Sequence, residues 1–177
     1  SPRSQMTPGE FVFSEPGTGK TLSALWAADY LMRTKKIRRC LILCPVSIMH
    51  SAWMSDLTNS IIHRSAIVAH HQKASRRVEM VQGDYEFVII NYDGLNLVAD
   101  LVIADEANAY KNVSTKRWKS LNKILKPDTL LWMMTGTPAA QSPLDAYGLA
   151  KLVNPKAIPR FFTAWRDLTM NKITMFK

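Results

Sequence analysis

A glycine-containing run that ends in lysine and threonine, Ser14-Glu-Pro-Gly-Thr-Gly-Lys-Thr21, is the strongest chemical signal in this sequence. Such a run lets successive backbone N–H groups converge on phosphate oxygens, because glycine has no Cβ and accepts unusual backbone angles. Lys20 can reach the β and γ phosphates of a nucleotide, and the Thr21 hydroxyl can be a ligand of Mg²⁺. Because the run departs from the strict G-x-x-x-x-G-K-[ST] pattern only at Ser14, we interpret it as a variant phosphate loop. Its predicted nucleotide-binding residues are Glu15, Pro16, Gly17, Thr18, Gly19, Lys20 and Thr21.

Two adjacent carboxylates close an apolar run later in the chain, Leu101-Val-Ile-Ala-Asp-Glu106. Beside a phosphate loop, Asp105 can hold the hydration shell of Mg²⁺, and Glu106 can polarise the attacking water as a general base. We therefore predict Lys20, Asp105 and Glu106 as the catalytic group, with Thr21 and Asp105 holding the magnesium ion. This prediction requires Lys20 and Asp105 to meet at the same edge of a parallel sheet.

Short apolar runs alternate with helix-like stretches along the whole sequence, as in folds where strands and helices follow one another. Several runs are almost entirely apolar, which is expected of strands that helices cover on both faces. The sequence therefore predicts an α/β fold of three layers with a mostly parallel central sheet. We expect strands at Phe11–Phe13, Cys40–Cys44, Ala66–Ala69, Phe87–Asn91, Leu101–Ala104 and Leu130–Met134, and helices at Thr21–Arg33, Ile48–Asn59, Ala74–Gln82, Thr115–Leu125 and Leu144–Val153.

One connection in this scheme is unusually short. Only the stretch from Tyr92 to Asp100 joins the fourth and fifth predicted strands, whereas a parallel crossover usually needs about a dozen residues or more. Either these two strands are not neighbours, or a segment of the protein is absent from the sequence after about Leu95. We favour the absent segment.

Composition narrows the classes of partner and site. The chain has 177 residues with 23 Lys and Arg against 14 Asp and Glu, a net charge of +9 that favours nucleic acid as a partner, although it also serves solubility. No apolar stretch is long enough for a membrane span, which excludes a membrane partner. Cys40 and Cys44 would lie roughly 13 Å apart on a strand, beyond disulfide reach, so we expect neither a disulfide nor a zinc site. A reducing compartment follows, either the cytoplasm of a bacterial or phage-infected cell or a nucleus.

Taken in order, the phosphate loop, Asp105-Glu-Ala-Asn108 and Thr135-Gly-Thr-Pro138 resemble motifs I, II and III of superfamily 2 helicases and translocases. Leu43-Cys-Pro-Val-Ser-Ile-Met-His-Ser-Ala-Trp53 resembles motif Ia of the chromatin-remodeller-like branch and its phage relatives, and Asn91-Tyr-Asp-Gly-Leu95 resembles motif Ib. The resemblance implies a first RecA-like motor domain over residues 1–155. Residues 156–177 would then be an annex leading towards a second motor domain outside this chain. The chain itself begins with Ser1 and not with an initiator Met.

In that family, motifs I and II bind and hydrolyse ATP with Mg²⁺, and motif III couples nucleotide state to movement. The resemblance thus assigns coupling to Thr135, Gly136 and Thr137. Motifs Ia and Ib grip the phosphates of one strand of DNA, or of RNA, which assigns nucleic-acid contacts to Pro45, Ser47, Tyr92 and Asp93. Ser47 also fits a plain N-cap of the helix that begins there.

Three departures from the family pattern stand out. Asn108 occupies a position where relatives commonly have His, Gln5 is too close to Gly19 to read adenine, and the chain contains no second motor domain. Two other functions remain open, namely a nucleotide-gated nucleic-acid-binding module without turnover and a small P-loop kinase. The five tryptophans, Trp53 among them, are interpreted as packing residues and not as platforms for stacked bases.

Overall fold

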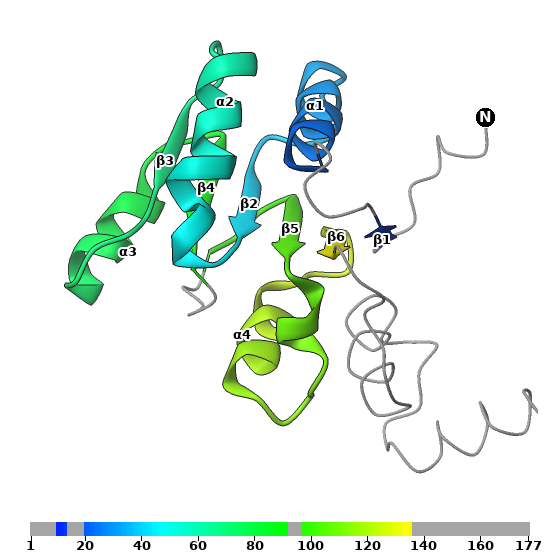
Figure 1. Ribbon diagram of the computed structural model, residues 1–177, viewed down its shortest axis with the longest axis vertical. Coiled ribbons are helices and arrows are strands. Elements are labelled where there is room, and N and C mark those ends of the chain that lie inside the picture. Colours follow the sequence, from blue (N-terminus) through cyan, green and yellow to red (C-terminus); the bar gives the residue numbers. More distant parts are fainter. Residues whose placement is uncertain (1–9, 14–19, 92–96, 136–177) are drawn as a thin grey trace, which may run out of the picture.

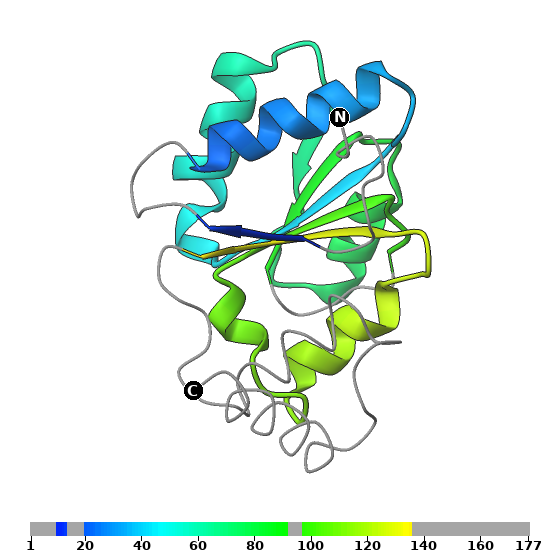
Figure 2. The same ribbon diagram turned by 90° about the vertical axis from the view of Figure 1, so that its right-hand side faces the viewer.

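The computed structural model describes residues 10–13, 20–91 and 97–135 of this chain, which form one parallel sheet with helices on both faces (Figures 1 and 2). The strands are β1 (Glu10–Phe13), β2 (Cys40–Leu43), β3 (Ala66–Val68), β4 (Phe87–Ile90), β5 (Leu101–Asp105) and β6 (Leu130–Thr135). Within the described part they are arranged in the order β1-β6-β5-β2-β4-β3, and every pairing is parallel. The predicted α/β class with a parallel central sheet is confirmed.

The helices divide between the two faces of the sheet. On one face lie α1 (Lys20–Arg33), the π-helix η3 (Met49–Met54) and α2 (Ser55–Ser60), and on the other lie α3 (Ala74–Gln82) and α4 (Lys116–Ile124) (Figure 2). Two 3₁₀ turns, η2 (Val46–Ile48) and η4 (Ala107–Tyr110), follow the carboxyl ends of β2 and β5. All residues of β2, β4 and β5 are buried, which explains why their sequences are apolar without alternation.

One predicted helix differs from its observed form. The stretch expected as a single helix over 48–59 is instead a continuous run of η2, η3 and α2, here called the 46–60 helical run. In its middle the N–H of Ser55 bonds to the carbonyl of His50, five residues earlier, as well as to that of Ala52. The helix predicted over 144–153 and the domain boundary predicted at residue 155 lie outside the described residues.

The short connection between β4 and β5 is explained by the strand order. β2 lies between these two strands, so they are not neighbours, and our preference for an absent segment rested on a wrong premise. An extended chain spans about 3.3 Å per residue, so the connection can return to the amino edge and pass over β2 without a helix. Leu97 and Ala99, at the described end of this connection, are buried in the same cluster as residues of α3 and α4, so this end lies on that face of the sheet.

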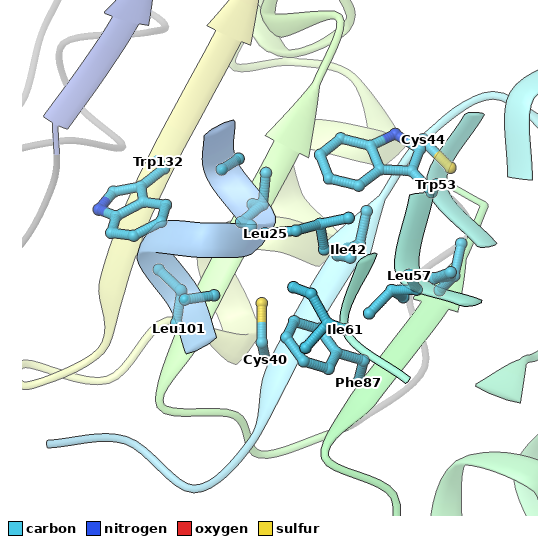
Figure 3. Packing of buried hydrophobic residues seen from close by; sticks show 14 of the residues in the cluster. Leu25, Cys40, Ile42, Cys44, Trp53, Leu57, Ile61, Phe87, Leu101 and Trp132 are labelled. Carbon is cyan, nitrogen blue, oxygen red and sulfur yellow. The ribbon is translucent and has the colours of Figure 1, made fainter. Parts of the chain in front are cut away.

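The cluster beneath α1 and the 46–60 helical run contains both cysteines (Figure 3). Cys40 and Cys44 are free thiols, as predicted, and they share this cluster with Ile42 because residues two apart on a strand face the same side. Burial raises the pKa of Cys40 far above its usual range, so its thiol stays protonated. Among the described residues, the helices are all too short or too polar to cross a bilayer.

Candidate nucleotide and magnesium site

Strand register brings the three chemical signals to one edge of the sheet. Phe13 at the end of β1 pairs with Thr135 at the end of β6, and Asp105 at the end of β5 pairs with Met134. The phosphate loop follows β1 and runs into α1 at Lys20, so motifs I, II and III leave the sheet at the same carboxyl edge. This is the edge where ligands bind in open α/β sheets.

Asp105 is a fully buried carboxylate held by two neutral donors. The indole N–H of Trp53 donates to its Oδ2 at 3.0 Å, and the backbone N–H of Glu106 donates to its Oδ1 at 2.9 Å. A buried carboxylate requires such donors, because without them the lost hydration would be very costly. Each oxygen has more than one acceptor site, so these bonds orient the group while leaving it able to accept a cation or its bound water.

Thr21, in the first turn of α1, donates its hydroxyl hydrogen to the half-buried carboxylate of Asp56. A hydroxyl that donates its hydrogen keeps its oxygen lone pairs for another partner. The Thr21 oxygen can therefore bind a cation while the hydroxyl continues to donate its hydrogen bond to Asp56.

The two hydrogen-bond partners of these residues come from the same short stretch. Trp53 and Asp56 are three residues apart in the 46–60 helical run, about one helical turn. Because Trp53 bonds to Asp105 and Asp56 bonds to Thr21, one short helical stretch holds both Thr21 and Asp105. The side chain of Lys20 lies outside the described part of the chain, as do Glu15, Pro16, Gly17, Thr18 and Gly19.

Sequence reasoning missed the polar role of this stretch. It treated Trp53 as a packing residue, which is correct for the fully buried ring but overlooks the indole N–H. It did not single out Asp56 at all. A signal was available, because a buried indole N–H normally finds an acceptor.

Glu106 follows Asp105 with its backbone in the left-handed region, at φ 57, and its side chain is exposed. For a residue with a Cβ this conformation costs roughly 1–2 kcal/mol. Such strain is commonly kept at functional sites. It turns the chain sharply at the strand end, so that Asp105 is buried while the next carboxylate faces solvent.

The negative charge of Asp105 acts on the thiol of Cys44. Burial, together with the charge of Asp105, raises the pKa of Cys44 to about 12. Cys44 is therefore an unreactive thiol beside the site and not a nucleophile.

The donor set fits magnesium and a nucleotide. Mg²⁺ prefers hard oxygen ligands, and proteins usually hold it through one or two carboxylates together with substrate phosphates and water. The hydroxyl of Thr21 and the oriented carboxylate of Asp105 are donors of this kind. Within the described ranges no group of three or more His, Cys, Asp or Glu side chains is placed to hold a metal ion.

The predicted nucleic-acid residues are only partly described. Pro45 is the N-cap of η2 and Ser47 lies inside η2 with an exposed side chain, so the interpretation of Ser47 as the N-cap is wrong. Its carbonyl instead accepts a hydrogen bond from the hydroxyl of Ser51 at 3.1 Å. Tyr92, Asp93, Gly136 and Thr137 lie outside the described residues, as do the side chains of Thr135 and Asn108.

Comparison with known protein families gives one match over nearly the whole chain. The model of the SNF2-related domain matches residues 2–175. Among curated proteins, the chain is 32% identical over 154 residues to the uncharacterized ATP-dependent helicase YqhH of Bacillus subtilis, covering 80% of this chain and 25% of that protein. It is 28% identical over 157 residues to the homolog of SWI/SNF-related matrix-associated actin-dependent regulator of chromatin subfamily A-like protein 1 from Caenorhabditis elegans, covering 83% and 22%.

A solved structure has the same fold. The Sulfolobus solfataricus SWI2/SNF2 ATPase core in complex with dsDNA superimposes with a TM-score of 0.78 at 21% identity, over 90% of this chain and 34% of that one. This chain thus spans about a quarter or less of the two curated relatives named above.

Proposed function

This chain belongs to the SNF2-related domain family, and on that premise we propose that it is the first ATP-binding domain of a motor that hydrolyses ATP and moves along DNA. The motif-based resemblance to the remodeller-like branch of superfamily 2 is thereby confirmed. The observation that carries the proposal is the buried Asp105 carboxylate, which Trp53 orients, while Asp56 from the same helical run bonds to Thr21 at the start of α1.

Each residue of the site has a separate task in this proposal. The phosphate loop and Lys20 bind the triphosphate, Thr21 and Asp105 hold the magnesium ion, and Glu106 orients and deprotonates the attacking water. Mg²⁺, when bound, neutralises the charge on the transferring phosphoryl oxygens. We assign the coupling role to Thr135, Gly136 and Thr137, of which Thr135 ends β6 directly after Met134, the pairing partner of Asp105.

The proposed partner of this motor is duplex DNA. The net charge of +9 supports a polyanionic partner, and the Sulfolobus solfataricus core of the same fold was solved on dsDNA. We place the DNA track at Pro45 and Ser47, the exposed start of the 46–60 helical run, and at Tyr92 and Asp93. RNA is the alternative polyanion, and a competition between the two in binding assays decides between them.

Nucleotide binding can be tested on the chain itself. A ligand at about 100 times its dissociation constant adds roughly 2.7 kcal/mol of stability, which raises the Tm of a chain of this length by about 5–10 °C. Lys20→Ala should abolish the shift caused by Mg²⁺ and ATP. Lys36→Ala, in the exposed turn after α1, is the matched control and should keep it. An undiminished shift in Lys20→Ala would mean that the nucleotide binds elsewhere.

Turnover is tested in a longer protein that joins this chain to a second RecA-like domain. We expect the 177-residue chain alone to hydrolyse ATP very slowly, because the arginine finger of related enzymes contributes on the order of 10³ to 10⁵ in rate. In the longer protein, ATP hydrolysis that duplex DNA stimulates supports a motor. Hydrolysis that is indifferent to DNA favours a kinase-like enzyme, and binding without hydrolysis favours a nucleotide-gated module.

A further inference from the structure

We infer that the 46–60 helical run couples DNA binding to the magnesium–nucleotide site, and that Trp53 and Asp56 are its two positioning residues. The inference rests on the proposed function, since it takes the site at Thr21 and Asp105 as the place where Mg²⁺ and ATP bind. It adds a physical path from the DNA track to the magnesium ligands that does not pass through motif III.

The path is made of two hydrogen bonds from one short stretch. The indole N–H of Trp53 donates to Asp105 at 3.0 Å, and the carboxylate of Asp56 accepts the hydrogen of Thr21. These two bonds fix the two side chains that the proposed site assigns to magnesium. Groups in this relation to a metal ligand set its orientation and basicity, and their loss typically costs 10–100-fold in metal affinity or activity.

Burial makes the run rigid on the side that faces the sheet. Met49, Trp53 and Leu57 recur every four residues and are almost completely buried in the cluster beneath α1. A close-packed element of this kind transmits displacement, because its interior side chains have little room to rearrange. The whole run therefore moves as a unit when one end is pulled.

The other end of the run is open to a partner. Val46 and Ser47 are exposed and follow directly after β2, where the proposal places DNA phosphates. Between this end and Asp56 lies the π-helix η3, a rare conformation that is found mostly at functional sites. DNA that pulls on residues 45–47 thus acts on Trp53 and Asp56 within about two turns of helix.

The coupling between DNA binding and nucleotide binding can be measured without ATP hydrolysis, because the effect of each ligand on the other is reciprocal. If DNA strengthens nucleotide binding by some factor, the nucleotide must strengthen DNA binding by the same factor. The intact protein that carries this chain should show a factor of about 5–150, the usual range for coupled sites. The measurements are the Kd of a non-hydrolysable ATP analogue with Mg²⁺, with and without duplex DNA, and the Kd of the DNA with and without the analogue.

Trp53→Phe removes the indole N–H that bonds to Asp105 and keeps an aromatic ring, and Asp56→Asn removes the negative charge that accepts from Thr21 and keeps the side-chain shape. Trp53→Phe and Asp56→Asn should bring the coupling factor close to 1 and raise the Mg²⁺ concentration for half-maximal analogue binding roughly 10–100-fold. The Kd of DNA without nucleotide should stay unchanged, which a merely unstable variant would not achieve. Asp56→Glu keeps the acceptor and should recover part of the coupling.

Matched controls separate positioning from packing. Trp132→Phe removes an indole from the same buried cluster, and Thr58→Val removes a hydroxyl that bonds only to the carbonyls of Met54 and Ser55 in the same run. Both should keep the wild-type coupling factor and Mg²⁺ dependence. Wild-type coupling in Trp53→Phe and Asp56→Asn would overturn the inference, as would a wild-type protein that binds both ligands without coupling. A wild-type protein that binds no ATP would overturn the proposed function itself.

Discussion

At the amino edge of the sheet, Asp29 and Glu86 face the guanidinium of Arg64, whereas at the carboxyl edge Asp105 accepts hydrogen bonds from an indole and a backbone N–H. The distances to Arg64 are 2.8 Å from Asp29 and 2.7 Å from Glu86. The guanidinium neutralises its carboxylates, while the indole N–H and the backbone N–H at Asp105 orient that carboxylate.

The difference separates a structural use of charge from a functional one. Arg64 joins α1 to the starts of β3 and β4, and it has no part in the proposed chemistry. Burial, together with the charge of Asp105, raises the pKa of Cys44, and Asp105 lies at the edge of the sheet where the proposed chemistry takes place. Changes at the carboxyl edge should therefore alter function with little loss of stability, and changes at the amino edge should do the reverse.

The largest expected effect is on hydrolysis, from Glu106→Gln at the carboxyl edge. Removing a general base typically lowers the rate 10²–10⁴-fold, so kcat in the longer, DNA-stimulated protein should fall by about that factor. The Tm of the variant and its shift with Mg²⁺ and ATP should stay close to wild type, because the exposed side chain contributes little to packing. A fall in kcat of less than about tenfold would remove Glu106 from the role of base.

At the amino edge, Arg64→Ala should destabilise the fold without touching nucleotide binding. Truncation leaves Asp29 and Glu86 without their shared guanidinium, and breaking such partly buried pairs costs about 2–4 kcal/mol. Denaturant unfolding of the chain measures the loss, and the ATP-induced Tm shift should persist. Arg76→Ala, which breaks an exposed pair with Glu79, is the matched control and should cost less than about 1 kcal/mol.

The same edge should give the fold its acid sensitivity. Burial alone would raise the pKa of Asp29, but hydrogen bonds and charges from Arg64 and His63 hold this pKa below its usual range, and Arg64 with Ser65 does the same for Glu86. The folded state therefore binds fewer protons than the unfolded one. The stability from these groups is complete above about pH 4.5 and falls as the pH drops through their folded-state pKa values.

Unfolding measured between pH 7 and pH 3 checks this expectation. The free energy of unfolding should decline below about pH 4.5 in the wild type, and the decline should be shallower in Arg64→Ala. Equal slopes in the two proteins would assign the acid sensitivity to other carboxylates.

The smallest expected effect concerns the two non-glycine residues of the described ranges that have positive φ angles, one at each edge. Lys35 follows the end of α1 at φ 63, and the next N–H, that of Lys36, bonds to the carbonyl of Leu31 at 2.9 Å, as in helix ends that favour glycine. Lys35→Gly should therefore raise the free energy of unfolding by up to about 1 kcal/mol. Glu106→Gly relieves similar strain but should lose hydrolysis. A stabilised Lys35→Gly beside an inactive Glu106→Gly would show that only the second strain has a function.

The parts of the fold that the sequence predicts are those that depend on local pattern. The apolar runs of β2, β4 and β5 and the helix over 74–82 are found within a residue or so of the predicted places. Strand order was not predictable, because these three strands are equally apolar and nothing in their composition says which lies in the centre. The 46–60 helical run was predicted as plain helix, since propensity does not distinguish a π-helix from an α-helix.

The site was predictable in its motifs but not in its supports. Thr21, Asp105 and Glu106 belong to short patterns with a known chemical logic, and each lies at the expected edge. Asp56 lies 35 positions from Thr21 in sequence and Trp53 lies 52 positions from Asp105, so each bond is a product of the fold. Supporting residues such as Trp53 and Asp56 are found by identifying the hydrogen-bond partner of each buried or half-buried polar group in the fold.

The central position of β2 has a consequence for how the protein is made. Cys40 pairs with Phe87 on one side and with Leu101 on the other, so both neighbours lie far downstream in the chain. At about 5–20 residues per second, a ribosome needs several seconds after β2 appears to deliver β5. Both edges of this apolar strand are open until β4 is made, and one edge stays open until β5 is made, so β2 is the segment where a chaperone has the most to protect.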